Sequence, residues 1–129
     1  MGAVIVVDSG VVIGVMDGAD PHHAAARAAL EKHREDDLRV PASAYAEALV
    51  RPGRVGRLEE VRADLAALGL AIDAIDGASA EAAARLRGLH GLRLSDALVL
   101  GHADAIGADA VLTTDRRWAR VSRLVRVVA

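Results

Sequence analysis

The chain of 129 residues contains no cysteine and no phenylalanine, and its only aromatic residues are Tyr45 and Trp118. The absence of cysteine excludes a disulfide framework, a thiolate nucleophile and a cysteine-based zinc site, and it is compatible with a reducing cytoplasm. Because aromatic rings are so scarce, the core must be aliphatic, and few side chains are available for stacking against a nucleic acid base.

The sequence also lacks a long uninterrupted apolar run. The apolar stretch at residues 3–16 is broken by Asp8, Ser9 and Gly14, it is too short to span a bilayer, and no basic region precedes it. We therefore expect a soluble cytoplasmic protein with no membrane segment. The hydrophobic fraction of 53% and the length are those of one compact globular domain over residues 1–129.

Short apolar runs alternate with helix-like segments along the whole chain. Apolar runs, several of them β-branched, predict strands at residues 3–7, 38–40, 70–75, 110–113 and 124–128. Periodic or alanine-rich segments predict helices at residues 11–15, 20–34, 42–50, 58–68, 79–89 and 96–106. This alternation over short connections predicts the α/β class, with a three-layer sandwich around a central parallel sheet of about five strands.

Capping residues predict where the helices begin and end. Asp20-Pro21 is expected to start the second helix, Pro52-Gly53 to break the third, and Ser95 to cap the last. The stretch at residues 51–57 is expected to be a loop. Three glycines are expected to end helices: Gly69, Gly91 and Gly107.

Four acidic residues stand at or near the ends of these elements. Asp8 and Asp115 each follow a predicted strand, Glu47 lies within a predicted helix beside apolar neighbours that favour its burial, and Asp96 begins another helix. The carboxyl ends of parallel strands face the place where α/β sheets bind their ligands. We therefore expect the four carboxylates to converge at one edge of the sheet.

Carboxylates that are packed together repel one another and call for a hard cation such as Mg²⁺ or Mn²⁺. Such an ion can bind a substrate phosphate and lower the pKa of a bound water, so that no histidine or cysteine nucleophile is needed. One or two ions would both satisfy this chemistry. Like-charge repulsion also predicts a raised pKa for at least one of the acids in the absence of metal. The arrangement suits hydrolysis of phosphodiester bonds.

Three blocks of sequence carry these acids. Asp8 lies in VIVVDSGVVIGVMDGADPHHAAA, Glu47 lies in VPASAYAEALVR, and both Asp96 and Asp115 lie in LRLSDALVLGHADAIGADAVLTTDRRW. Taken together and in this order, the blocks resemble the PIN-domain ribonucleases, and most closely the VapC-type toxins of bacterial toxin–antitoxin pairs. The resemblance covers nearly the whole chain.

This resemblance implies a PIN-like fold and a metal-dependent endoribonuclease that acts as the toxin of such a pair. It implies that Asp8, Glu47, Asp96 and Asp115 are both the catalytic residues and the ligands of Mg²⁺ or Mn²⁺. It further implies RNA as the substrate, a cognate antitoxin protein as a partner, and a homodimer whose two sites line one groove.

Further residues support this interpretation less directly. Ser9 and Thr113 are candidates for ordering metal-bound water, although strand propensity also explains a threonine at 113. Two arginine clusters could follow an RNA backbone or form a solvated rim: Arg51, Arg54 and Arg57, and Arg116, Arg117 and Arg120.

Other conspicuous residues have structural interpretations. His22 and His23 lack the spacing of a zinc motif, because neighbouring residues on a helix point in different directions. His102 is expected to be solvated or to contact a second copy, and Trp118 to pack against the sheet edge. One apolar stripe could contact a partner or the core: Leu58, Val61, Leu65 and Leu68.

Alternative functions remain for comparison. A phosphoryl-accepting receiver domain would need a lysine near the fourth or fifth strand, but the single lysine, Lys32, lies in an early helix. A catalytically silent PIN-type binding module is compatible with the fold, although all four acids are present. A DNA-directed nuclease at the same site is also compatible, because a metal site acts on the phosphate and does not read the 2′-hydroxyl.

Overall fold

A five-stranded parallel sheet forms the centre of the computed structural model, which describes residues 2–129. Its order is β3-β2-β1-β4-β5, and every neighbouring pair is parallel. The strands are β1 (Val4–Val7), β2 (Asp37–Pro41), β3 (Leu70–Asp73), β4 (Ala110–Thr113) and β5 (Val125–Val127). The middle strand, β1, is apolar on both faces because helices cover both sides of the sheet. The predicted fold class is confirmed.

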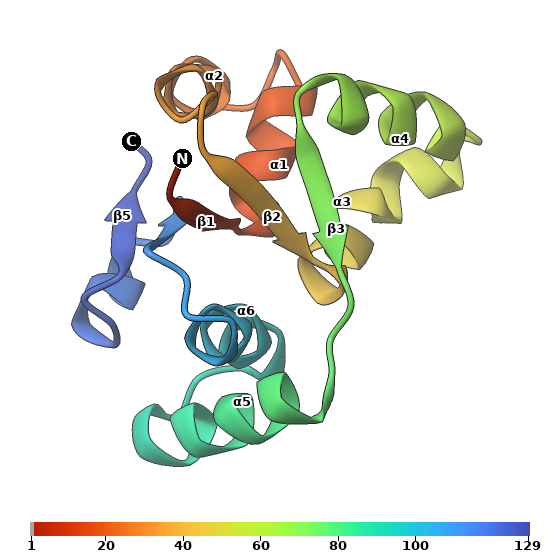
Figure 1. Ribbon diagram of the computed structural model, residues 1–129. Helices are drawn as coiled ribbons and strands as arrows, with labels where there is room; N and C mark the ends of the chain where they lie inside the picture. Colours follow the sequence, from red (N-terminus) through yellow and green to blue (C-terminus); the bar gives the residue numbers. More distant parts are fainter. Residues whose placement is uncertain (1) are drawn as a thin grey trace.

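Helices form the two outer layers of the sandwich. They are α1 (Ser9–Met16), α2 (His23–Lys32), α3 (Ala42–Arg54), α4 (Leu58–Ala67), α5 (Gly77–His90), α6 (Leu94–Ala105) and a 3-10 helix, η1 (Arg116–Arg120). Figure 1 shows α5 and α6 paired below the sheet, away from α1, α2 and α4. Within residues 2–129, no helix has the length and apolar character needed to cross a membrane.

The third helix continues through the proline that was expected to break it. Pro52 lies in the last turn of α3, which ends at Arg54, so only the final helical hydrogen bonds are affected by the missing N–H. The predicted loop at residues 51–57 is therefore reduced to residues 55–57. In that turn Gly56 has a positive φ of 71°.

Two predicted helix starts were also displaced. The Asp20 carboxylate accepts a hydrogen bond from the N–H of His22 in a turn, and α2 begins only at His23. The last helix begins at Leu94, so Ser95 lies inside its first turn and caps nothing. The three expected terminators were correct, since all have positive φ: Gly69, Gly91 and Gly107.

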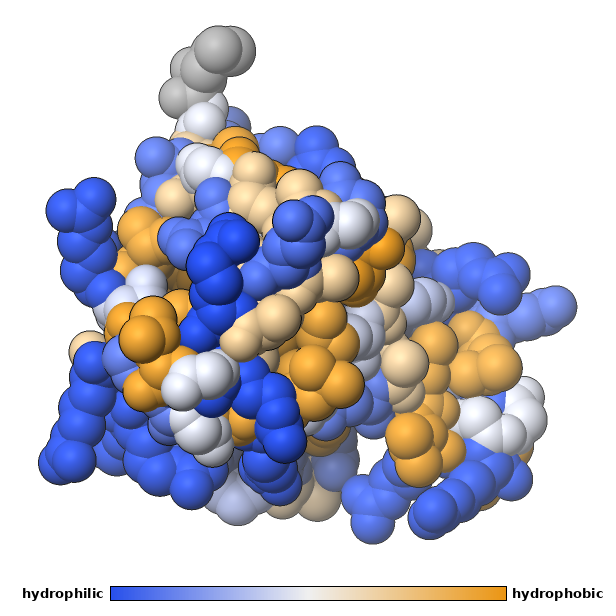
Figure 2. All heavy atoms as spheres, turned by 90° about the horizontal axis from the view of Figure 1, so that it is seen from below, coloured by the Kyte–Doolittle hydropathy of each residue, from blue (hydrophilic) through white to orange (hydrophobic). Residues whose placement is uncertain are grey.

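The apolar stripe on α4 is divided between core and surface. Val61 and Leu65 are buried in the main core, whereas Leu58 and Leu68 remain exposed. Figure 2 shows apolar surface on the projection formed by α3 and α4, where Val50 and Val55 are exposed as well. Between α1, α3 and α4 lies a groove of about 560 Å³ with a largely apolar lining. Core packing thus explains the inner half of the stripe only.

A buried polar network joins α5, α6 and the sheet. His102, 3% exposed, places Nδ1 2.9 Å from Ser79 Oγ on α5 and Nε2 2.9 Å from Asp73 Oδ2 at the end of β3. Arg39 on β2 donates to the other oxygen of Asp73 at 3.0 Å. The prediction of a solvated or dimer-contact His102 was wrong. The imidazole instead fixes α6 against β3 and α5, because buried polar groups must find partners.

Close packing of α5 on α6 depends on Gly101. A Cβ at this position would lie 2.5 Å from the Ala83 backbone nitrogen and 2.8 Å from the Ala83 Cα. Both atoms belong to the α5 backbone, which no rotamer change can move. Glycine therefore sets the distance between the two helices, and α6 carries Asp96 in its first turn.

We expect Gly101→Ala to lower the free energy of unfolding by about 1–3 kcal/mol, because the methyl group forces the two helix backbones apart. Urea unfolding followed by circular dichroism measures this change. Gly88→Ala in α5 is the matched control: a Cβ there meets no atom within 4 Å, so helix propensity should raise stability by about 0.5–1 kcal/mol. Equal effects of the two substitutions would contradict the role given to Gly101.

Candidate acidic active site

The first acid, Asp8, stands between the end of β1 and the start of α1. It is 7% exposed, its Oδ1 accepts a hydrogen bond from the N–H of Ser9 at 2.7 Å, and its Oδ2 accepts from Thr113 Oγ1 at 2.9 Å. The parallel pairing of β1 and β4 places Val7 beside Leu112 and so brings Asp8 to Thr113. Ser9 and Thr113 therefore contact the Asp8 carboxylate directly.

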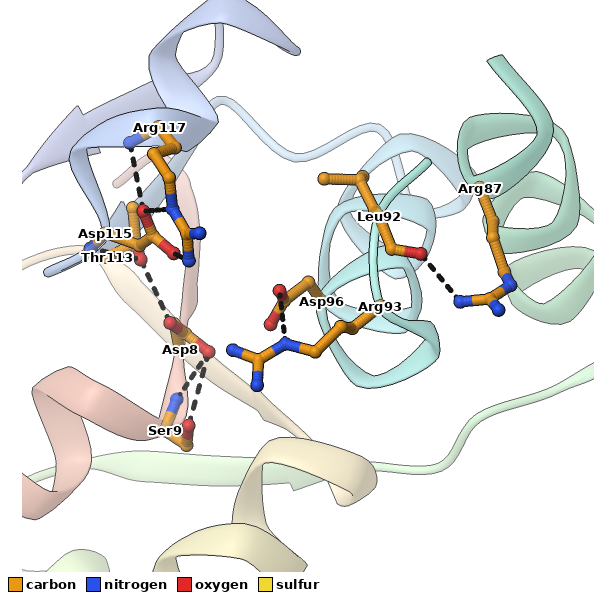
Figure 3. A network of polar contacts seen from close by, with 9 residues as sticks. All are labelled: Asp8, Ser9, Arg87, Leu92, Arg93, Asp96, Thr113, Asp115 and Arg117. Atoms are coloured by element: carbon orange, nitrogen blue, oxygen red, sulfur yellow. Dashed lines mark hydrogen bonds and ion pairs between the residues drawn. The ribbon is translucent and has the colours of Figure 1, made fainter. Parts of the chain in front are cut away.

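A second acid is tied to the same threonine. The backbone N–H of Asp115 donates to Thr113 Oγ1 at 3.1 Å, so one hydroxyl joins the residues that follow two adjacent strands. The side chain of Asp115 caps η1, with Oδ1 accepting from the N–H of Arg117 at 2.9 Å. Figure 3 shows this chain from Asp8 through Thr113 to Asp115.

The third acid reaches the site from the opposite side. Asp96 lies in the first turn of α6, and Figure 3 shows its carboxylate and the Arg93 guanidinium on the side of α6 that faces Asp8. Arg93 Nε lies 3.6 Å from Asp96 Oδ2. Asp8, Asp96 and Asp115 thus lie around the carboxyl ends of β1 and β4.

Glu47 takes a more peripheral place than its apolar neighbours suggested. It is exposed on α3 and lines the groove between α1, α3 and α4, together with Asp17 and Arg51. Its expected burial is wrong, because Tyr45 and Leu49 pack inward without covering it. The Glu47 charge still acts on Asp8 and raises the pKa of that carboxyl slightly.

The pKa values of Asp8 and Asp115 are shifted in opposite directions. Burial raises the pKa of Asp8 to about 6, against the hydrogen bonds from Thr113 and Ser9, and the negative charges of Asp96 and Glu47 add to the rise. Desolvation, and not the like-charge repulsion expected from the sequence, is the main cause. The hydrogen bonds of Arg117 hold the pKa of Asp115 below its ordinary value, and the charge of Arg93 lowers it further.

Arginine side chains form ion pairs with two of the carboxylates that a metal would use, Asp115 and Asp96. Arg117 donates to Asp115 from Nε at 3.0 Å and from Nη2 at 2.8 Å. Within residues 2–129, no group of three or more histidine, aspartate or glutamate side chains lies close enough together to hold a metal ion. The donor set nevertheless suits Mg²⁺ or Mn²⁺, because it consists of carboxylate oxygens around a buried acid whose charge is uncompensated.

A cleft of about 380 Å³ adjoins the acids. Its walls include Asp96, Asp115, Arg93, Arg117 and Arg120. Trp118 also lines it but is otherwise buried in the core, as expected of a ring packed near the sheet edge. Arg93 was missed by the sequence reasoning, although its position three residues before Asp96 on a predicted helix start was a usable signal.

The other candidate arginines lie at the surface. Arg51, Arg54 and Arg57 are exposed near the end of α3, and Arg57 pairs with Glu60 at 2.9 Å. Arg116 is exposed on η1. Arg117, a candidate either for following the RNA backbone or for a solvated rim, binds Asp115 in this structure. His23 binds the Gly14 carbonyl oxygen through Nδ1 at 2.7 Å, consistent with a structural role at the start of α2.

The raised pKa of Asp8 predicts how the metal-free protein responds to pH. Because the folded protein binds this proton more tightly than the unfolded chain, the contribution of Asp8 is fully favourable below about pH 4 and is lost as the pH rises through about 6. In chelator, wild type should therefore lose about 2–2.5 kcal/mol relative to Asp8→Asn between pH 4 and pH 7. Urea unfolding at intermediate pH values measures this difference.

Comparison with Asp8→Asn removes the opposite trends of acids whose pKa is lowered, such as Asp36 and Asp76, because both proteins contain them. If the free energies of unfolding of the two proteins changed in parallel with pH, a buried carboxyl with a raised pKa at position 8 would be contradicted. A direct measurement of the Asp8 pKa near its ordinary value by nuclear magnetic resonance would contradict it equally.

Solved structures share this fold over nearly its full length. A toxin–antitoxin complex from Klebsiella pneumoniae contains a chain that is 21% identical with a TM-score of 0.82, covering 97% of this chain and 98% of that one. VapBC2 from Rickettsia felis, bound to a promoter DNA fragment, is 16% identical with a TM-score of 0.76, and the match covers 98% of this chain and 99% of that one. The sarcin-ricin loop cleaving toxin VapC20 from Mycobacterium tuberculosis is 14% identical with a TM-score of 0.73, and the match covers 92% of this chain and 95% of that one.

A comparison with curated proteins gave no match. The family model described as the PIN domain matches residues 5–124, which include all four acids and the strands and helices that position them. The chain belongs to the PIN domain family.

Proposed function

We propose that this protein is a metal-dependent endoribonuclease that acts as the toxin of a toxin–antitoxin pair. RNA phosphodiester bonds would be hydrolysed at the acidic edge formed by Asp8, Glu47, Asp96 and Asp115. The observation that carries the proposal is the chain from Asp8 through Thr113 to Asp115 at the ends of two adjacent strands, with Asp96 opposite. The sarcin-ricin loop cleaving toxin of similar fold supports RNA as the substrate class.

The chain's own residues have distinct tasks in this reaction. Mg²⁺ or Mn²⁺ held by the acids would polarise the phosphoryl oxygen and supply a water of lowered pKa. Asp8 is preorganised by Ser9 and Thr113, and with a pKa of about 6 it is mostly ionised at neutral pH. Asp96 lies in the first turn of α6, where the helix dipole favours negative charge. Arg93 and Arg117 offer guanidinium donors to phosphate oxygens.

The proposed partner is an antitoxin that lays a short segment over the groove between α1, α3 and α4. Toxin–antitoxin complexes among the similar folds support such a partner. The groove has apolar walls from Ile13, Met16 and Val50, and it contains Glu47 at its polar rim. Of the four acids, Glu47 lines this groove, and an arginine or lysine of the antitoxin would extend from it to the carboxylates of the acidic edge and compete with the metal. Assembly as a homodimer belongs to the same proposal, with exposed Leu58 as a candidate contact.

Asp8→Asn, Asp96→Asn and Asp115→Asn should each reduce RNA cleavage by on the order of 100-fold or more, because each removes one anionic ligand from the reacting centre. The measurement is the cleavage rate of an RNA oligonucleotide in Mn²⁺, with circular dichroism to verify folding. Asp104→Asn is the matched control, since Asp104 lies on α6 as well but lines a different cleft. It should cleave at the wild-type rate.

A DNA oligonucleotide of the same sequence tests the alternatives. Cleavage of DNA but not RNA would replace the proposed substrate, and metal binding without cleavage of either would leave a silent binding module. Undiminished RNA cleavage by wild type in chelator would contradict metal dependence.

Divalent metal should also stabilise the folded protein without any substrate. A ligand that binds only the folded state at a hundredfold excess over its Kd adds about 2.7 kcal/mol. For a domain of this size, this corresponds to a rise in Tm of roughly 8–16 °C. Thermal melts of wild type and Asp96→Asn, with and without Mn²⁺, measure the effect. The same shift in both proteins, or no shift in wild type at millimolar Mn²⁺, would rule out these acids as the metal site.

A further inference from the structure

Arg117 satisfies both carboxylate oxygens of Asp115. Its Nε donates to Oδ1 at 3.0 Å and its Nη2 donates to Oδ2 at 2.8 Å, which is the two-pronged geometry of an arginine–carboxylate pair. The two residues are two positions apart at the start of η1, so the pair is local in the sequence. The same oxygens are the donors that Asp115 would present to a cation.

The attachment of Asp115 has a fixed part and a movable part. The fixed part consists of the Arg117 N–H on Oδ1 at 2.9 Å and the bond from the Asp115 N–H to Thr113 at 3.1 Å. The movable part is the Arg117 guanidinium, whose side chain is 78% exposed. If the guanidinium leaves, the backbone contacts still hold the carboxylate in place, and no core packing is broken.

Asp8 has no comparable cationic partner among the residues that the structure describes. Its oxygens accept from the neutral groups of Ser9 and Thr113, so its charge is hydrogen-bonded but not neutralised. Asp8 is therefore a buried carboxylate without an ion-pair partner, whereas Asp115 is compensated by an arginine that solvent can reach. A divalent cation attracted by Asp8 would compete with Arg117 for Asp115.

We propose that Arg117 is an exchangeable internal counter-ion of the acidic edge. In the metal-free protein it neutralises Asp115. When a divalent cation takes the carboxylate, the guanidinium turns into the adjoining cleft, where Arg93 and Arg120 also lie, and there it receives a phosphate of the substrate. This inference rests on the proposed function, because it presupposes a metal at the four acids.

The exchange assigns two successive contacts to one side chain. It explains how an arginine placed to bind a phosphate can be occupied by a carboxylate in the metal-free state. It also links substrate binding to metal loading, because the guanidinium is free for phosphate only after Asp115 has another cation. Arg117 is therefore a positioning residue for the site and a substrate contact once released.

The test measures Mn²⁺ binding without RNA, by the electron paramagnetic resonance signal of free Mn²⁺, for wild type and matched variants. Arg117→Gln should bind Mn²⁺ about two- to fivefold more tightly, as expected when an exposed ion pair no longer competes. Arg116→Gln removes a neighbouring exposed charge from the same 3-10 helix and should change the affinity by less than Arg117→Gln. Arg117→Lys, which keeps the charge without the fork, should lie between wild type and Arg117→Gln.

Two further measurements separate exchange from a purely structural role. Mg²⁺ should shift the Arg117 Nε–H resonance of wild type toward that of a solvated arginine, with Arg117→Gln used to assign the signal. With a noncleavable RNA analogue as the probe and Mg²⁺ present, Arg117→Gln should weaken RNA binding while Arg116→Gln weakens it less. A purely structural role of Arg117 would not make Arg117→Gln bind metal more tightly and RNA more weakly.

The outcomes distinguish this inference from the proposed function. Wild type that binds Mn²⁺, with Arg117→Gln binding it equally or more weakly, would overturn the counter-ion role and leave the nuclease proposal intact. Wild type that does not bind Mn²⁺ would overturn the proposed metal site itself, and the exchange with it. An Arg117 resonance unmoved by saturating Mg²⁺ would show that the guanidinium stays on Asp115 and would also overturn the exchange.

Discussion

The hydrogen bond between Thr113 and Asp8 is the interaction on which the rest of the site depends. It exists because β1 and β4 are adjacent and parallel, with Val7 beside Leu112. The same hydroxyl oxygen accepts the N–H of Asp115, so the register of two short strands orders both acids. A slip of one residue would turn Thr113 to the other face of the sheet and separate them. The core valines of β1 and β4 thus serve the chemistry by fixing that register.

Helix α6 brings the third acid to this edge, and its position is set far from Asp96. Gly101 allows α5 to pack closely against it, and His102 ties its last turns to β3 and α5. A helix is stiff over three turns, so these contacts near one end determine where the first turn presents Asp96. The packed pair of α5 and α6 is therefore part of the machinery that assembles the site.

The strands, the helix order, and the positions of Asp8 and Asp115 behind two strands could be predicted from the sequence, because each follows from a local pattern: a β-branched run, a repeat of apolar residues, or a carboxylate after a strand. The pairing of side chains could not be predicted in this way. His102 lies on a helix whose apolar residues outnumber its polar ones, and its partners Ser79 and Asp73 are 23 and 29 positions away. Glu47 was misjudged for the complementary reason, since apolar neighbours on a helix need not cover the residue between them.

The carboxylates of the site differ in their burial and in their charged neighbours. Four carboxylates with equal environments would only repel one another, but here burial raises the pKa of Asp8, while Arg117 lowers that of Asp115. The protein thereby keeps one negative charge fixed, buried and available, and shields another with a group that water can reach. Folding without a cation is tolerable because the shielding is local, and the unmatched buried charge is what would favour the cation of the proposed function. The arginines beside the acids are thus as much a part of the site's electrostatics as the acids themselves.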